Sequence, residues 1–230
     1  MDAIRIEKAG KCIKNNWIYK DISVAFEQGK IHGLIGRNGA GKTMLLKSIC
    51  GLTRVTIGEI WVNGCLLGNE TDIPDSVGAI IEIPGFLPNL SGFANLKYLA
   101  GLKKRIGEKR IKECMEMVGL QAENRKHVGK YSLGMRQRLG IAQAIMEEPD
   151  IIILDEPMNG LDNDGVEDVR KILLGLKKEG KTILLASHHK EDIDMLCDKV
   201  YRMEKGKLYM EQENVTVQGS AGLKKTDGVD

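Results

Sequence analysis

The chain has 230 residues, of which 42% are hydrophobic and 29% are charged, and its net charge is +2. This near balance argues against a protein built to coat nucleic acid, and the length suits one large α/β domain or two small ones. No apolar run approaches the roughly 18 residues needed to cross a bilayer, and the N-terminus lacks the apolar core of a signal peptide. We therefore expect a cytoplasmic chain that would need another subunit for any membrane span.

The first third of the chain is predicted to form strands, a glycine-rich turn and one helix. Residues 2–8 and 17–26 carry apolar and β-branched residues, and the turn Gln28-Gly29-Lys30 closes them. These opening strands indicate an antiparallel β subdomain. The elements expected next are a strand at 31–35, a helix at 42–50, a strand at 59–62 that runs into the turn Asn63-Gly64, and a strand at 77–81.

The middle of the chain, from about residue 91 to 148, has a mostly helical pattern. Met135, Leu139, Ala142 and Met146 recur at spacings of three and four residues, which predicts an amphipathic helix. This region interrupts the strand pattern on either side of it. We therefore interpret it as a helical insertion.

The last third returns to alternating strands and helices. Strands are expected at 151–154, 182–186 and 200–203, with a helix at 166–176 between the first two. Such alternation predicts an α/β fold with a mostly parallel sheet. We expect a single domain over 1–211, with a core at about 1–82 and 149–211 and the insertion at 83–148. A polar, flexible tail is expected at 212–230.

Residues 36–43 read Gly-Arg-Asn-Gly-Ala-Gly-Lys-Thr and fit the pattern G-x-x-x-x-G-K-[ST] between a strand and a helix. The glycines let successive backbone amides point at one phosphate, and the helix N-terminus adds partial positive charge. Lys42 is expected to reach the β- and γ-phosphates, and the Thr43 hydroxyl to bind Mg²⁺. The pattern predicts a P-loop NTPase core that binds ATP. Its candidate nucleotide-binding residues are Gly36, Asn38, Gly39, Gly41, Lys42 and Thr43.

Two carboxylates, Asp155 and Glu156, follow the apolar run Ile151-Ile152-Ile153-Leu154. A strand of this kind is buried, and its carboxyl end points at the ligand crevice of an open α/β sheet. We expect Asp155 to hold Mg²⁺, through water. Glu156 is the candidate catalytic residue that orients or deprotonates the attacking water.

The segment Tyr131-Ser132-Leu133-Gly134-Met135-Arg136-Gln137-Arg138 lies shortly before the acidic strand, and here the chain resembles the ABC ATPase family. The signature of that family reads roughly L-S-G-G-Q, so Ser132 and Gly134 agree with it while Leu133 and Met135 depart. Asn159-Gly160-Leu161-Asp162 and Ser187-His188 match later family elements in the same order. The resemblance covers about residues 2 to 210.

The resemblance implies partners and further site residues. In the family, two ATPase domains pair head to tail, and each ATP lies between the phosphate loop of one and the signature of the other. Ser132 and Gly134 would thus contact ATP bound to a second subunit, which we expect to be an identical chain, and His188 would contact the γ-phosphate and position the water. A separate transmembrane permease would hold the pair at the cytoplasmic face of the membrane.

Two positions depart from the family pattern. Glu82 stands where the family usually has a Gln that touches Mg²⁺ and the water, and a carboxylate there can still bind the metal. Ile13 stands near the usual aromatic residue that stacks on adenine. Trp17 and Tyr19 are the aromatic alternatives, but their spacing differs, so base stacking is left open.

Residues 82–90 and 132–142 resemble one subgroup, the bacitracin- and lantibiotic-type exporters and immunity systems. We therefore expect a subunit that powers export of an antimicrobial peptide or drug. Phe86, Leu87 and Leu90 are expected to form the docking surface for the permease. The alternatives are a soluble ABC ATPase in repair or translation, an importer ATPase, and a small-molecule P-loop kinase, which would leave the signature unexplained.

Overall fold

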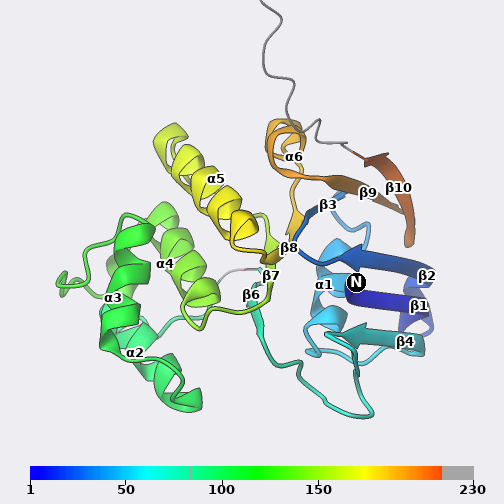
Figure 1. Cartoon of the computed structure of the whole chain (residues 1–230), viewed down its shortest axis with the longest axis horizontal. Helices are drawn as coiled ribbons and strands as arrows, with labels where there is room; N and C mark the ends of the chain where they lie inside the picture. The colour runs from blue at the N-terminus through cyan, green and yellow to red at the C-terminus, as the bar shows by residue number, and fades with distance from the viewer. Residues whose placement is uncertain (83, 214–230) are drawn as a thin grey trace, which may run out of the picture.

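The first strands of the chain pair into an antiparallel sheet in the computed structural model, which describes residues 1–82 and 84–213 (Figure 1). Its strands are β1 (Asp2–Ile13), β2 (Asn16–Glu27), β4 (Ile57–Val62) and β5 (Cys65–Leu66). Lys14 and Asn15 join β1 to β2, and Asn63 and Gly64 join β4 to β5, all with the positive φ of tight hairpins. The expected antiparallel subdomain is confirmed, and β1 and β2 are longer than the apolar pattern indicated.

The second sheet carries the predicted functional loops. Its strands are β3 (Ile31–Ile35), β6 (Val77–Ile80), β7 (Ile151–Asp155), β8 (Thr182–Ala186), β9 (Lys199–Glu204) and β10 (Lys207–Glu213). They lie in the order β10-β9-β3-β8-β7-β6, and every pair is parallel except β10 with β9. The mostly parallel sheet is therefore confirmed, and the carboxyl ends of β3, β7 and β6 share one edge.

Strand β10 was not expected from the sequence. It includes Gln212 and Glu213, which the sequence analysis assigned to the tail. The rest of the expected tail, 214–230, lies outside the described residues, as does Ile83.

The helices are α1 (Lys42–Ile49), α2 (Gly92–Lys103), α3 (Glu108–Met117), the 3₁₀ turn η1 (Val128–Lys130), α4 (Leu133–Ile145), α5 (Asn163–Lys178) and α6 (Lys190–Leu196). Helices α2, α3 and α4 come between β6 and β7 in the chain and gather at one end of the molecule, away from the antiparallel sheet (Figure 1). In the described part of the chain, none of the helices combines the length and apolar character that a bilayer crossing requires.

Strand β7 illustrates how the core is divided. Ile151 and Ile153 pack with α1 and the antiparallel sheet, whereas Ile152 and Leu154 pack with the helices on the opposite face. All four side chains are buried, as expected for a parallel strand covered on both faces. Helix α1 is thereby held between the two sheets, directly after the loop that follows β3.

Helix α4 packs closely on the edge strand β6. A Cβ on Gly78 would lie 1.8 Å from the Ala144 carbonyl oxygen, so only glycine permits this approach. Leu139, Ala142 and Met146 of the predicted apolar stripe are buried. The C-terminal half of α4 is therefore seated on the sheet that carries the acidic pair.

Candidate active site

The loop between β3 and α1 carries the predicted phosphate-binding residues. Gly36, Gly39 and Gly41 have φ values of 151°, 80° and 108°, which L side chains rarely adopt. A Cβ on Gly36 would also lie 2.3 Å from the Met203 carbonyl oxygen. Helix α1 begins after Gly41, which has no side chain to occupy the first amides of the helix. The helix N-terminus and the positive end of its dipole are thus available to an anion.

Lys42, Thr43 and Asp155 meet where β3 and β7 end. Lys42 is buried, and its Nζ donates to the Gly36 carbonyl oxygen at 2.7 Å, which holds the ammonium over the loop. The Thr43 hydroxyl donates to Asp155 Oδ2 at 2.7 Å. Burial raises the pKa of Asp155, although the hydrogen bond from Thr43 acts in the opposite direction. A hydroxyl beside a buried carboxylate is an oxygen donor set that suits Mg²⁺.

Glu156 and His188 form a hydrogen-bonded pair. His188 Nδ1 lies 2.8 Å from Glu156 Oε2, and the His188 backbone amide approaches the same oxygen at 3.4 Å. The Glu156 amide donates to the Ala186 carbonyl oxygen at 2.9 Å, which fixes the residue against the neighbouring strand β8. The two predicted catalytic residues are 32 positions apart in the sequence, and the fold brings them into direct contact.

Among the described residues Glu82 has no hydrogen bond to Thr43 or Asp155, although its charge contributes to raising the pKa of Asp155. Its Oε1 instead accepts a hydrogen bond from Lys47 Nζ at 2.8 Å, and the pair lies at the rim of the site. Lys47 comes from the last turn of α1, and Glu82 follows β6. Of the three residues proposed to hold Mg²⁺, Thr43 and Asp155 are brought together, and Glu82 has a lysine as its partner.

The signature residues lie at the N-terminus of α4. Ser132 is exposed and caps the helix, because its Oγ accepts from the Met135 amide at 3.2 Å. Gly134 passes close to the loop after the acidic pair, where a Cβ would lie 2.9 Å from the Gly160 carbonyl oxygen. Ser132 and Gly134 are thus placed together at the start of this helix, and neither of them lines the phosphate site of its own chain, although Leu133 between them does.

A cavity of about 720 Å³ unites most of the predicted site. Its predicted lining residues are Asn38, Gly39, Gly41, Lys42, Thr43, Glu82, Asp155 and Glu156. The loop after β3 and the start of α1 form one part of the cavity wall, and the residues at the ends of β6 and β7 form another. Its volume is within the range of sites that bury a small-molecule ligand.

The β1–β2 hairpin carries the residues considered for stacking on adenine. Tyr19 is fully buried and its hydroxyl donates to Ser48 Oγ at 2.6 Å, so it belongs to the core. Ile13 and Trp17 are both partly exposed, and neither lines the cavity. Ile18 does line it, so an aliphatic side chain is the hairpin residue presented to the site.

Sequence reasoning missed several lining residues. Gln137 is buried on α4, and its Nε2 donates to the Glu156 carbonyl oxygen at 3.3 Å. Lys47 was missed as well, although its spacing of four residues from Thr43 places both on one helix face, a signal that the motif alone does not contain. The further lining residues are Ile18, Arg37, Met44, Leu133 and Asn159.

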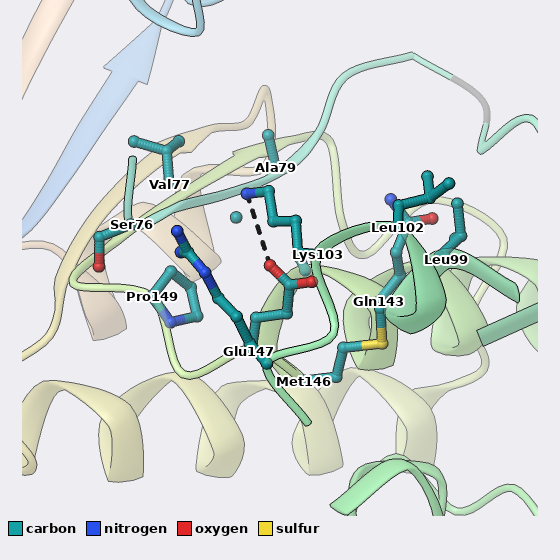
Figure 2. A pocket seen from close by; sticks show the side chains of 13 residues that line it. Ser76, Val77, Ala79, Leu99, Leu102, Lys103, Gln143, Met146, Glu147 and Pro149 are labelled. Carbon is teal, nitrogen blue, oxygen red and sulfur yellow. Dashed lines mark ion pairs between the residues drawn. The ribbon is translucent and has the colours of Figure 1, made fainter. Parts of the chain in front are cut away.

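A second, smaller cavity of about 200 Å³ lies between β6, the C-terminal half of α2 and the end of α4 (Figure 2). Leu99 and Leu102 of α2 contribute apolar groups on one side of it. Lys103 and Glu147 form an ion pair at 3.5 Å, drawn as the dashed line in Figure 2. This cavity combines apolar, basic and acidic side chains and lies outside the phosphate site.

The chain matches the family described as ABC transporter over residues 19–159, more than half of its length. An uncharacterized ABC transporter ATP-binding protein of Bacillus subtilis is 47% identical over 205 residues, which cover 89% of this chain and 94% of that protein. A bacitracin transport ATP-binding protein of Enterococcus faecalis is 41% identical, with 93% of this chain and 70% of that protein covered.

A lantibiotic transport ATP-binding protein of Streptococcus pyogenes is 35% identical, and the match covers 91% of this chain and 90% of that protein. Among solved structures, a dimeric ATP-binding cassette in a post-hydrolysis state, bound to ADP and Pi, superimposes with a TM-score of 0.84. That match covers 92% of this chain and 99% of the other at 22% identity, and it is a likeness of fold.

Proposed function

Because this chain belongs to the ABC transporter family, we propose that it is the subunit that binds and hydrolyses ATP to power an exporter of an antimicrobial peptide or drug. The observation that carries the proposal is the cavity in which the phosphate loop, Asp155 and Glu156 meet. The cargo class is supported by the relatives named for bacitracin and lantibiotic transport. A soluble ATPase in repair or translation has no such support.

The chain's own residues account for triphosphate binding. The glycine loop offers backbone amides and the positive end of α1 to the phosphates. Lys42 is held over the loop by the Gly36 carbonyl oxygen, so its ammonium needs little reorganisation to meet a phosphate oxygen. Asn38 and Gly39 line the same cavity as Lys42.

Thr43, Asp155 and Glu82 are the residues that we propose for Mg²⁺. Thr43 and Asp155 already share a hydrogen bond, and Mg²⁺ commonly takes only one or two protein oxygens beside phosphates and waters. When bound, the ion neutralises charge that develops on the phosphate oxygens. Glu82 is within the same lining and would need to leave Lys47 to reach the ion.

Glu156 is proposed as the general base for the attacking water. Its carboxylate is oriented by His188 and its backbone by β8, so one oxygen is held and the other remains to accept a proton. His188 is partly exposed beside this carboxylate and is proposed to contact the γ-phosphate. Together these residues position the water and receive its proton.

The partner ATPase subunit is proposed to be a second copy of this chain, in a head-to-tail pair. Ser132 and Gly134 lie on the surface at the N-terminus of α4, where a helix dipole favours phosphate. Leu133, between them, is 56% exposed, which a subunit contact would cover. The solved cassette with the same fold is described as dimeric, which supports this arrangement.

For the permease, the cavity of Figure 2 offers a docking place besides the one expected from sequence. Of the residues expected there, Phe86 packs against the core of the helical region, whereas Leu87 is 48% exposed. Leu102, by contrast, is 69% exposed beside the cavity of Figure 2, with Lys103 and Arg105 next to it. We propose that an amphipathic cytoplasmic helix of the permease, with acidic residues on its polar side, docks here at the cytoplasmic face of the membrane.

The test of the function is ATP titration of the purified protein and its Lys42→Ala variant. Loss of the buried ammonium should weaken ATP binding at least about 100-fold. Lys171→Ala, which removes an exposed lysine on α5, is the matched control and should bind like the wild type. Equal affinity of the Lys42 variant and the wild type would remove the phosphate-loop assignment.

A further inference from the structure

Lys47 and Glu82 occupy a defined place in the nucleotide cavity. Lys47 lies one helical turn after Thr43, so both side chains project from the same face of α1. Strands β6 and β7 are parallel neighbours, so Glu82, just after β6, and Asp155, the last residue of β7, lie at adjacent strand ends. Two side chains on this face of α1 therefore donate hydrogen bonds to two acids. Thr43 donates to Asp155 at 2.7 Å, and Lys47 donates to Glu82 at 2.8 Å.

The balance between basic and acidic side chains in the cavity lining includes this pair. Among the described residues the lining has as many basic as acidic side chains, and removal of Lys47 would leave the acids in excess. ATP carries several negative charges, so an uncompensated carboxylate at the rim would repel it. The neutral glutamine usual in the family carries no such charge. The charged lining residues are Arg37, Lys42, Lys47, Glu82, Asp155 and Glu156.

We propose that Lys47 is a positioning residue that holds the Glu82 carboxylate at the rim, away from the phosphates, so that a nucleotide triphosphate can bind beside an acid. The proposal rests on the proposed function and adds a residue to the site. It differs from a direct role, in which Lys47 would bind the phosphates itself. In the proposed role, the importance of Lys47 depends on the presence of Glu82.

The pair is too exposed to serve mainly as a structural tie. The Glu82 side chain is 61% exposed and that of Lys47 is 29% exposed, and ion pairs of this kind add little to folding stability. Removal of Lys47 should therefore lower the melting temperature by no more than about 2–4 °C. An effect on nucleotide affinity without an effect on melting separates the proposed role from a structural one.

The experiment is a double-mutant cycle read by ATP titration in EDTA, so that no metal enters the comparison. The four proteins are the wild type, Lys47→Met, Glu82→Gln and the double variant. We expect Lys47→Met to weaken ATP binding roughly tenfold when Glu82 is present and less than about twofold when Gln replaces it. The same loss in both backgrounds would overturn the proposal, because Lys47 would then act on the phosphates directly.

Two controls make the result specific. Lys97→Met and Glu108→Gln break a comparable exposed ion pair between α2 and α3, and their cycle should leave ATP affinity unchanged. Lys47→Arg keeps the charge and should bind ATP within about twofold of the wild type, so failure of this rescue in a folded protein would also overturn the proposal. Failure of the wild type to bind ATP, or of Lys42→Ala to weaken binding, would instead remove the proposed function itself.

Discussion

At the residue scale, the two acids that follow β6 and β7 share an unusual backbone conformation. Glu82 has φ of 63° and Glu156 has φ of 52°, both in the left-handed region that favours glycine. A residue with a side chain costs on the order of 1 kcal/mol or more in this region. The conformation turns the chain sharply at each strand end, and both carboxylates then line one cavity. The fold thus accepts local strain where the acids are needed.

Asp155 gives a prediction about stability and pH. Because burial raises the pKa of Asp155 in the folded state, its charged form is disfavoured by folding, and this destabilisation is present at pH values above the folded pKa and disappears below it. Asp155→Asn should therefore raise the melting temperature of the nucleotide-free protein at neutral pH, by about 2–4 °C for each kcal/mol relieved. The difference should shrink as the pH is lowered. Thermal melts of both proteins across pH, without nucleotide or metal, test this, and a variant less stable at every pH would contradict it.

The site residues that could be predicted from sequence are those that lie close together in the chain. The loop from Gly36 to Thr43 was found because eight contiguous residues, a strand and a helix define it. The Lys47–Glu82 pair spans 35 positions and the Gln137–Glu156 contact 19, so only the fold brings these partners together. The same holds for Ile18, since the pattern of a hairpin does not reveal which of its side chains reaches the loop.

At the element scale, the sequence predicted the strands and helices that have a buried, regularly spaced set of apolar residues. It did not predict elements that are exposed or short. Strand β7 is entirely buried, and its apolar run identified it. Strand β10 is mostly exposed and polar, and α6 has only seven residues, so neither has a clear apolar period. Asn95 of α2 is a buried polar residue whose side chain amide exchanges hydrogen bonds with the Leu87 backbone at 2.8 and 3.1 Å.

Helix α2 gives a prediction about the permease. Leu102→Ser should weaken co-purification with the permease and reduce transport, because it removes an apolar group that is 69% exposed and that we propose to be covered by the partner. The ATPase rate and melting temperature of the isolated subunit should stay unchanged. Leu52→Ser, at a leucine that is 62% exposed after α1, is the control. Normal co-purification of the Leu102 variant would place the docking surface elsewhere.

At the scale of the whole molecule, the proposed head-to-tail pair depends on hydrolysis to separate. Glu156→Gln should lower turnover by roughly 10²–10⁴ while ATP still binds, because the general base is lost and the phosphate loop is intact. With ATP and Mg²⁺ this variant should accumulate as a dimer. Gel filtration and chemical crosslinking measure the dimer, and Glu59→Gln, at an exposed residue of β4, is the control. A variant that stays monomeric by both methods at saturating ATP would argue against the paired arrangement.

The close approach of Gly78 and Ala144 has a mechanical consequence for such a pair. With no side chain between strand and helix, the end of α4 is held directly against β6, and Ser132 stands 12 residues away at the opposite end of the helix. That distance is about 18 Å along the helix axis, so a tilt of about 10° would move the serine by roughly 3 Å. This displacement equals the length of one hydrogen bond. A small tilt of α4 about its end on β6 would therefore be enough to engage or release a neighbour's phosphate.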